Sequence, residues 1–358
     1  MSALERFQSA FSRLGADAAI ISSELNIRYL CGFNYTDGFL LILPDKAYLL
    51  ADFRYIEAVR AQTEGLEIIM PESDMLSELK LLLSIHQART VVIEDNAVSY
   101  ADFVKWSKKF DSSELVCKAS DILTELRTKK TAEELALIAH AQSITDAAFE
   151  HILGFITPER TELEIALELE FFMRGMGSEG VAFDTIAVSG ASSSLPHGVP
   201  SDRKLSNGFL TMDFGAKYKG YCSDMTRTVV IGRADEDIKR VYNTVLRAQL
   251  SALDGIHEGV SCRNADRIAR DIIYGEGFSR CFGHSLGHGV GLYIHESPSL
   301  SPRAPEDCVL CRGNVVTVEP GIYIEGKYGC RIEDMIAIGH DGNIINFTKS
   351  TKELIEIY

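Results

Sequence analysis

Two aspartates in the second half of the chain are spaced as a cation site would require. Asp213 lies in an apolar run, residues 209–214, and Asp224 follows eleven residues later, where we expect the next strand of a hairpin. A carboxylate within an apolar strand is costly to bury unless a positive charge neutralises it. The pair therefore suggests a bound cation, with exposure at a strand edge or ion pairing with Arg227 as the alternatives.

A glycine-rich segment supplies imidazoles for metal binding or proton transfer. Residues 283–291 contain His284 and His288, and His295 follows closely. Glycines let a backbone approach a site, and imidazole is both a common metal ligand and a base that titrates near neutral pH. We expect these histidines to ligate or to act as acids and bases, rather than to be isolated core or surface residues.

Two glutamates complete the set. Glu319 ends an apolar run and is followed by Pro-Gly, which stops a strand. Glu333 alternates with Arg331 and Met335, as residues on one face of a strand do. Singly, each could be a solvated carboxylate. Together, four carboxylates and one histidine provide ligands for two divalent cations, with Mn²⁺ expected and Co²⁺, Zn²⁺ or Fe²⁺ as alternatives.

The elements that must position these residues follow a repeated pattern. Capping boxes at Thr131 with Glu134 and at Thr161 with Glu164 each predict the start of a helix. A helix pair, a β region, a second helix pair and further strands predict an α+β domain, in which helices cover a curved antiparallel sheet with an internal pseudo-repeat. The expected elements begin at 131 and then span 161–175, 209–231, 235–253, 261–275, 315–318 and 335–338.

The first third of the chain has a different pattern. Short apolar runs that fit buried strands alternate with amphipathic stretches, which predicts an α/β domain over residues 1–126, followed by the second domain over 127–358. This part has no His, Asp or Glu cluster with ligand-like spacing, so we expect it to be a scaffold or a substrate wall. The expected strands are Ala18–Ile21, Phe39–Leu43, Ala47–Leu50 and Thr90–Ile93.

The composition excludes several classes of partner. With 36 basic and 51 acidic residues, the chain of 358 residues carries a net charge of −15, which repels nucleic acid and anionic membrane surfaces. Apolar runs are too short to cross a bilayer, and the first residues do not look like an export signal. We therefore expect a cytoplasmic protein with reduced cysteines, in which even the Cys308/Cys311 pair is ordinary packing.

With these motifs, the sequence resembles the pita-bread metallopeptidases, and within them the proline-specific branch of Xaa-Pro dipeptidases (prolidases) and Xaa-Pro aminopeptidases. The resemblance covers nearly the whole chain. Residues 26–33 and 52–55 look like the creatinase-type N-terminal domain of that branch, with Cys31 where Thr or Ser is commoner. It implies a creatinase-like α/β domain followed by an α+β pita-bread catalytic domain.

The resemblance also implies a ligand set for two metal ions. Asp213 would bind one ion, and His288 with Glu319 would bind the other. Asp224 and Glu333 would bridge both ions.

Further residues would act beside the metals. The resemblance implies that His197, His284 and His295 hold the substrate and stabilise the transition state, with His295 the expected donor to the oxyanion. Glu319 would also accept a proton. Arg331 would lie behind the ligands, unless it forms a simple ion pair with a strand carboxylate.

The implied reaction is hydrolysis of the peptide bond before proline in small peptides with proline in second position, by a homodimer. A dipeptidase is favoured, and an aminopeptidase acting on longer peptides is the alternative. Methionine aminopeptidases share the ligands but do not need the first domain, whereas creatinase-type amidinohydrolases share both domains and lack the ligands. A non-catalytic peptide-binding protein on this fold would be expected to have lost ligands or histidines.

Overall fold

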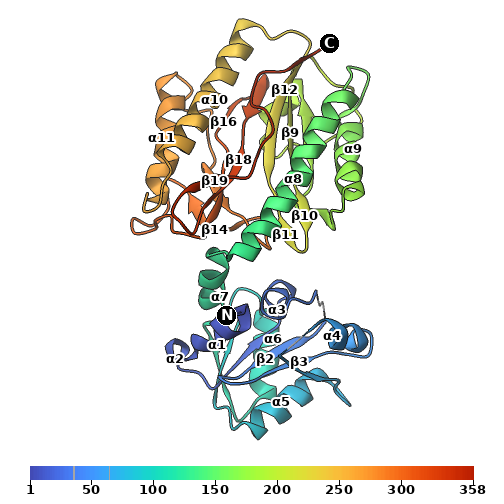
Figure 1. Cartoon of the computed structure of the whole chain (residues 1–358), viewed down its shortest axis with the longest axis vertical. Coiled ribbons are helices and arrows are strands. Elements are labelled where there is room, and N and C mark those ends of the chain that lie inside the picture. The colour runs from blue at the N-terminus through green and yellow to red at the C-terminus, as the bar shows by residue number, and fades with distance from the viewer. Residues whose placement is uncertain (35–36, 64) are drawn as a thin grey trace. The chain divides into compact units, whose positions relative to one another are not determined.

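The chain forms two compact units, Met1–Arg127 and Thr128–Tyr358 (Figure 1). The computed structural model describes residues 1–34, 37–63 and 65–358. Within these ranges, no helix has both the length and the apolar character needed to cross a membrane.

The first unit is built on a six-stranded mixed sheet in the order β4-β3-β2-β1-β5-β6. β1 pairs antiparallel with β2 and parallel with β5. Three predicted strands are confirmed at their expected bounds, and β2 ends one residue earlier than expected. The strands are Ala18–Ile21 (β1), Phe39–Ile42 (β2), Ala47–Leu50 (β3), Glu67–Ile69 (β4), Thr90–Ile93 (β5) and Glu114–Cys117 (β6).

Helices connect and cover this sheet. Ile20 and Leu41 in the sheet belong to one apolar core with Leu79 and Trp106, which come from two of the helices. Burial of this core is what holds the unit together. The helices are Ala3–Ser9 (α1), Phe11–Leu14 (α2), Glu24–Cys31 (α3), Ile56–Gln62 (α4), Met75–Ile85 (α5), Tyr100–Lys109 (α6) and Ala119–Thr128 (α7).

The second unit carries two helix pairs, on opposite sides of its sheets in Figure 1. α8 (Ala132–Phe155) packs with α9 (Glu162–Gly175), and α10 (Glu236–Gly255) packs with α11 (Cys262–Gly275). The predicted capping boxes are present at the starts of α8 and α9. Because α9 and α11 have equal lengths and equivalent places in the two pairs, the expected internal pseudo-repeat is confirmed.

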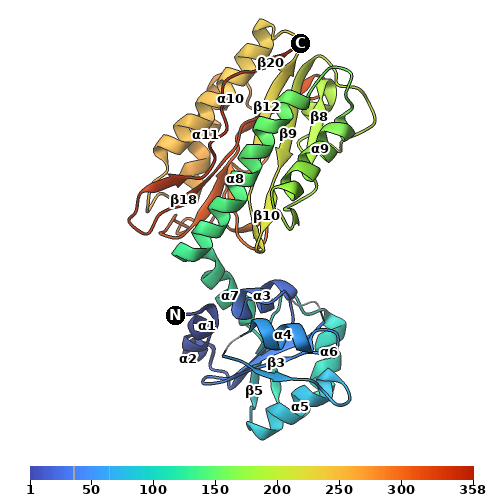
Figure 2. The same cartoon turned by 45° about the vertical axis from the view of Figure 1, so that its right-hand side comes forward.

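Two larger sheets lie between these helix pairs, in the orders β20-β12-β9-β8 and β14-β13-β15-β18-β19 (Figure 2). β10 lies between β7 and β11 in a third sheet, and β16 pairs with β17. The strands are Gly180–Val181 (β7), Ile186–Ser189 (β8), Gly208–Phe214 (β9), Ala216–Tyr218 (β10), Tyr221–Cys222 (β11), Met225–Ile231 (β12), Gly287–Gly289 (β13), Glu296–Leu300 (β14), Val315–Val318 (β15), Gly321–Ile324 (β16), Tyr328–Arg331 (β17), Asp334–Ile338 (β18), Ile344–Asn346 (β19) and Glu356–Ile357 (β20). A 3-10 helix covers Gly190–Ser194.

The predicted strand positions of two carboxylates are wrong. Asp224 lies between β11 and β12, where the chain leaves the sheet of β10 and joins β9. Glu333 lies between β17 and β18, where the chain leaves β16 and joins β15. At the second break, Arg331, Glu333 and Met335 alternate as they would in one continuous strand, so the pattern could not reveal that the hydrogen-bonding partner changes there.

Candidate metal centre

A cavity of about 750 Å³ in the second unit is lined by all nine residues that the sequence analysis proposed for the site. The acidic and imidazole groups share this cavity with an apolar wall that includes Phe183, Ile186 and Val199. The cavity therefore offers both a polar reaction centre and apolar surface for a small organic substrate. The nine residues are His197, Asp213, Asp224, His284, His288, His295, Glu319, Arg331 and Glu333.

The polar side chains reach the cavity from separate strands. Asp213 lies near the end of β9 opposite Thr226 of β12, and Glu319 directly follows β15. His288 is the central residue of β13, between two glycines. A Cβ atom on Gly287 would lie only 1.9 Å from the carbonyl oxygen of Thr317, so glycine is required for β13 to pack this closely.

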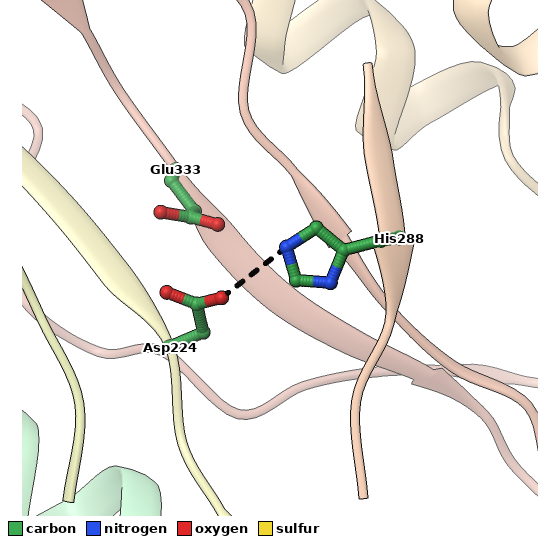
Figure 3. A group of neighbouring side chains, drawn as sticks. All are labelled: Asp224, His288 and Glu333. Carbon is green, nitrogen blue, oxygen red and sulfur yellow. Dashed lines mark ion pairs between the residues drawn. The ribbon is translucent and has the colours of Figure 1, made fainter. Parts of the chain in front are cut away.

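Three side chains converge as a metal-binding group would (Figure 3). One ligand atom from each of Asp224, His288 and Glu333 lies within 4.8 Å of the others. His288 Nε2 is 3.5 Å from Asp224 Oδ2 and 3.5 Å from Glu319 Oε1. One imidazole nitrogen is therefore surrounded by carboxylate oxygens from three different parts of the fold.

The hydrogen bonding of His288 leaves this nitrogen suited to a metal. Nδ1 lies 3.0 Å from the carbonyl oxygen of Gly289, which can only accept, so Nδ1 carries the proton. Burial lowers the pKa of His288 to about 4, so the ring is neutral at neutral pH. The lone pair of Nε2 therefore faces the carboxylates and is free to bind a cation.

The carboxylates of the site are buried and lie close enough to repel one another. Burial, followed by repulsion from Glu333 and other carboxylates, raises the pKa of Asp224 well above its ordinary value. Burial and repulsion from Glu319 do the same to Glu333. Burial raises the pKa of Glu319 to about 8, against the opposing effect of Arg331. A cation among these groups would relieve the repulsion and keep them ionised.

Asp213 supplies an unpaired oxygen to the same cavity. Its Oδ2 accepts a hydrogen bond from Arg331 Nη2 at 2.6 Å, whereas its buried Oδ1 has no hydrogen-bond partner among the described residues. A buried carboxylate oxygen without a donor is costly, and a metal ion is one partner that would satisfy it. The donor set of oxygens and one imidazole nitrogen thus fits divalent cations.

Two threonines that the sequence analysis did not single out orient the glutamates. The hydroxyl of Thr226 donates to Glu333 Oε2 at 2.7 Å, and that of Thr317 donates to Glu319 Oε1 at 3.2 Å. The Thr226 oxygen also accepts from Arg331 Nε, and the Thr317 oxygen accepts from the backbone N–H of His288. Each hydroxyl therefore links two groups of the site.

Arg331 connects Asp213 to a histidine through Tyr323, a third residue that the sequence pattern did not indicate. Arg331 Nη1 donates to the Tyr323 hydroxyl at 2.6 Å, and this hydroxyl lies 3.0 Å from His284 Nε2. His284 Nδ1 faces the carbonyl oxygen of Ser285, so Nε2 is the acceptor. Burial lowers the pKa of His284 to about 3.

Ion pairs of Arg227 and Arg331 were the alternatives to a metal site, and the two arginines pair with different carboxylates. Arg227 pairs with Asp334 at 2.8 Å and not with Asp213 or Asp224, whereas Arg331 pairs with Asp213 at 2.6 Å. The two remaining histidines are exposed residues of the cavity: His197 follows the 3-10 helix, and the His295 ring lies 4.5 Å from the His288 ring, centroid to centroid. Both rings are therefore accessible from the cavity.

Comparison with known proteins identifies the family. Residues 136–340 match Metallopeptidase family M24, and residues 4–129 match the Creatinase/Prolidase N-terminal domain. The chain is 36% identical to an Xaa-Pro dipeptidase of Pyrococcus horikoshii, over 95% of this chain and 94% of that protein.

Two solved structures have the same architecture over their full lengths. An Xaa-Pro dipeptidase from Bacillus anthracis is 42% identical with a TM-score of 0.94, and covers 99% of both chains. An X-Pro aminopeptidase from Thermotoga maritima is 36% identical with a TM-score of 0.90, over 97% of this chain and 99% of the other. The expected creatinase-like and pita-bread fold is therefore confirmed, and the chain belongs to metallopeptidase family M24.

Proposed function

We propose that this metallopeptidase uses two divalent cations to hydrolyse the peptide bond before proline in Xaa-Pro dipeptides. The convergence of Asp224, His288 and Glu333 in a cavity large enough for a short peptide carries the proposal. The relatives named as Xaa-Pro dipeptidases support the substrate class.

The proposed ligands divide between the two ions. Asp213 would hold one ion through the oxygen that lacks a hydrogen-bond donor, and His288 and Glu319 would hold the other. Asp224 and Glu333, which lie where the chain passes between sheets, would be shared by both ions. When bound, the ions lower the pKa of a water molecule and polarise the substrate carbonyl.

Residues of the chain would then guide the proton and the substrate. Glu319 accepts a proton from the attacking water, because its Oε2 is not the oxygen that Thr317 holds. His295 donates to the oxyanion that develops, and His197, exposed at the cavity, orients the proline end. His284 and Arg331 keep the ligand side of the cavity in place through Tyr323.

A dipeptidase and an aminopeptidase differ in whether the cavity accepts residues beyond proline. Dipeptidase names among the relatives favour the first, and the Thermotoga maritima structure, named as an aminopeptidase, keeps the second as the alternative. Cleavage of Ala-Pro, Ala-Pro-Ala, Ala-Ala and Met-Ala-Ser by Mn²⁺-loaded protein separates them. Cleavage of Ala-Pro alone supports our proposal, and preferential cleavage of Ala-Pro-Ala before proline makes the chain an aminopeptidase.

We also propose that the ion is Mn²⁺, that the assembly is a homodimer and that the protein is located in the cytoplasm. Residues 1–126 and 127–358 are the two proposed domains. Carboxylate-rich sites suit Mn²⁺, although one imidazole also admits Co²⁺, Zn²⁺ or Fe²⁺. Sedimentation equilibrium checks the assembly, because a dimer has twice the 39.6 kDa mass of one chain.

A further inference from the structure

Helix α11 carries an ion pair between Asp266 and Arg270, two residues that have no part in the function proposed above. Arg270 Nε and Nη2 each donate to one oxygen of Asp266 at 2.7 Å, so the pair is bidentate. The Asp266 side chain is 1% exposed and that of Arg270 is 14% exposed. Such a planar, two-bond contact fixes the orientation of the guanidinium.

Both residues of this pair also form hydrogen bonds to one short segment. Arg270 Nη1 donates to the carbonyl oxygen of Phe282 at 2.9 Å, and Nη2 donates to that of His284 at 2.7 Å. Asp266 Oδ1 accepts from the N–H of Leu286 at 3.0 Å, a donor it shares with the carbonyl oxygen of Leu300. The guanidinium also lies 4.2 Å from the centre of the Phe282 ring.

This segment leads directly into the metal centre. Residues 282–286 precede β13 and form no strand of their own, so the contacts from α11 replace the ladder that would otherwise hold them. Within the segment, the His284 ring bonds to Tyr323. The carbonyl oxygen of Leu286 accepts from the N–H of Glu319 at 2.8 Å.

We propose that Asp266 and Arg270 are positioning residues of the peptidase reaction, which clamp residues 282–286 and thereby place His284. The described residues that line the cavity do not include either of them, so they act through the segment and not on the substrate. The inference rests on the proposed peptidase function, because it concerns where His284 stands during that reaction.

The first test compares variants of the full chain with Ala-Pro as substrate. Arg270→Met removes all donors to the segment, and we expect kcat/KM to fall about 10- to 100-fold, as when other outer partners of a metal site are lost. Arg270→Lys retains a cation that reaches one carbonyl oxygen and should recover part of that loss. Asp266→Asn keeps the shape and removes the charge, and it serves if Arg270→Met does not fold.

A matched control breaks an exposed ion pair at the same helix pair. Arg247, in α10, lies 2.6 Å from Glu276, which follows α11, and both side chains are more than one-third exposed. Arg247→Met should leave kcat/KM within about twofold of the original. A general loosening of the helix pair would instead lower the activity of both variants.

Two further readouts separate positioning from stability. Hydrogen exchange measured by mass spectrometry should be faster across residues 282–286 in Arg270→Met than in Arg247→Met, since the segment loses its clamp. The double variant Arg270→Met/His284→Ala should lose less kcat/KM than the product of the two single losses, because both substitutions act on one side chain.

The outcomes also distinguish this inference from the proposed function. Unchanged exchange in residues 282–286, or fully multiplicative effects with His284→Ala, would overturn the clamp even if the chain cleaves Ala-Pro. If the unmodified protein cleaves no Xaa-Pro peptide, the proposed function fails, and a positioning role for this reaction is overturned with it. Faster exchange, partial rescue by lysine and a less-than-multiplicative cycle together support it.

Discussion

Among single residues, Thr226 links two charged groups of the site. Its hydroxyl donates to Glu333 and accepts from Arg331, while all three side chains are buried. A hydroxyl in this place fixes both the Glu333 oxygen and the arginine, which a methyl group of equal size cannot do.

Thr226→Val should therefore weaken metal binding without removing a ligand. We expect the affinity for Mn²⁺, measured by calorimetry on metal-stripped protein, to fall about 10- to 100-fold. Thr244→Val is the matched control, because Thr244 is also buried and donates only within its own helix, to Arg240. A dissociation constant within twofold of the original in Thr226→Val would contradict the linking role.

The exposed ring of His295 carries the second prediction. If it donates to the oxyanion, His295→Ala should lower kcat for Ala-Pro by about 10² or more, with metal binding unchanged. The measurement is steady-state kinetics at saturating Mn²⁺. An unchanged kcat would exclude this role and leave a metal as the main stabiliser of the developing charge.

Charged residues could be predicted from the sequence, whereas their neutral partners could not. Asp213, Glu319 and His288 interrupt apolar or glycine-rich runs, so their chemistry is visible in the pattern. Thr226 and Tyr323 fit ordinary strand positions and become part of the site only through contacts between distant segments. Sequence spacing carries no trace of such contacts.

At the element scale, both carboxylates proposed as bridging ligands lie where a strand changes sheets. Asp224 lies between β11 and β12, and Glu333 lies between β17 and β18. Backbone that leaves one ladder and joins another can turn a side chain out of the regular alternation, toward the space between the sheets. The starts of α8 and α9 could be predicted because capping boxes mark them locally, whereas a change of strand partner is a non-local event.

One buried ion pair stabilises the place between β17 and β18 where the chain changes sheets. Arg227 in β12 pairs with Asp334, the first residue of β18, and both side chains are 1% exposed. Asp334→Asn removes the counter-charge of Arg227 and also of Lys352, whose Nζ lies 2.6 Å from Asp334 Oδ2, so we expect the free energy of unfolding to fall by about 3–5 kcal/mol in urea titrations. Glu276→Gln, which breaks an exposed pair with Arg247, should cost at most about 1 kcal/mol. Equal losses would contradict the importance assigned to the buried pair.

At the scale of the whole molecule, bound cations should stabilise the second unit. Its cavity gathers four carboxylates whose mutual repulsion favours unfolding when no cation is present. A ligand at 100 times its dissociation constant stabilises the folded state by about 2.7 kcal/mol per site. We therefore expect EDTA to lower the melting temperature and Mn²⁺ to restore it, as followed by calorimetry. If neither EDTA nor Mn²⁺ changed the melting temperature, the carboxylates would bind no ion.

The measurement that bears most directly on the proposed function is hydrolysis of Ala-Pro and Ala-Ala by metal-stripped protein, before and after addition of Mn²⁺. We predict no cleavage before addition, and cleavage of Ala-Pro but not Ala-Ala afterwards. Cleavage of Ala-Pro without added metal, or equal cleavage of Ala-Pro and Ala-Ala, would contradict a metal-dependent Xaa-Pro dipeptidase.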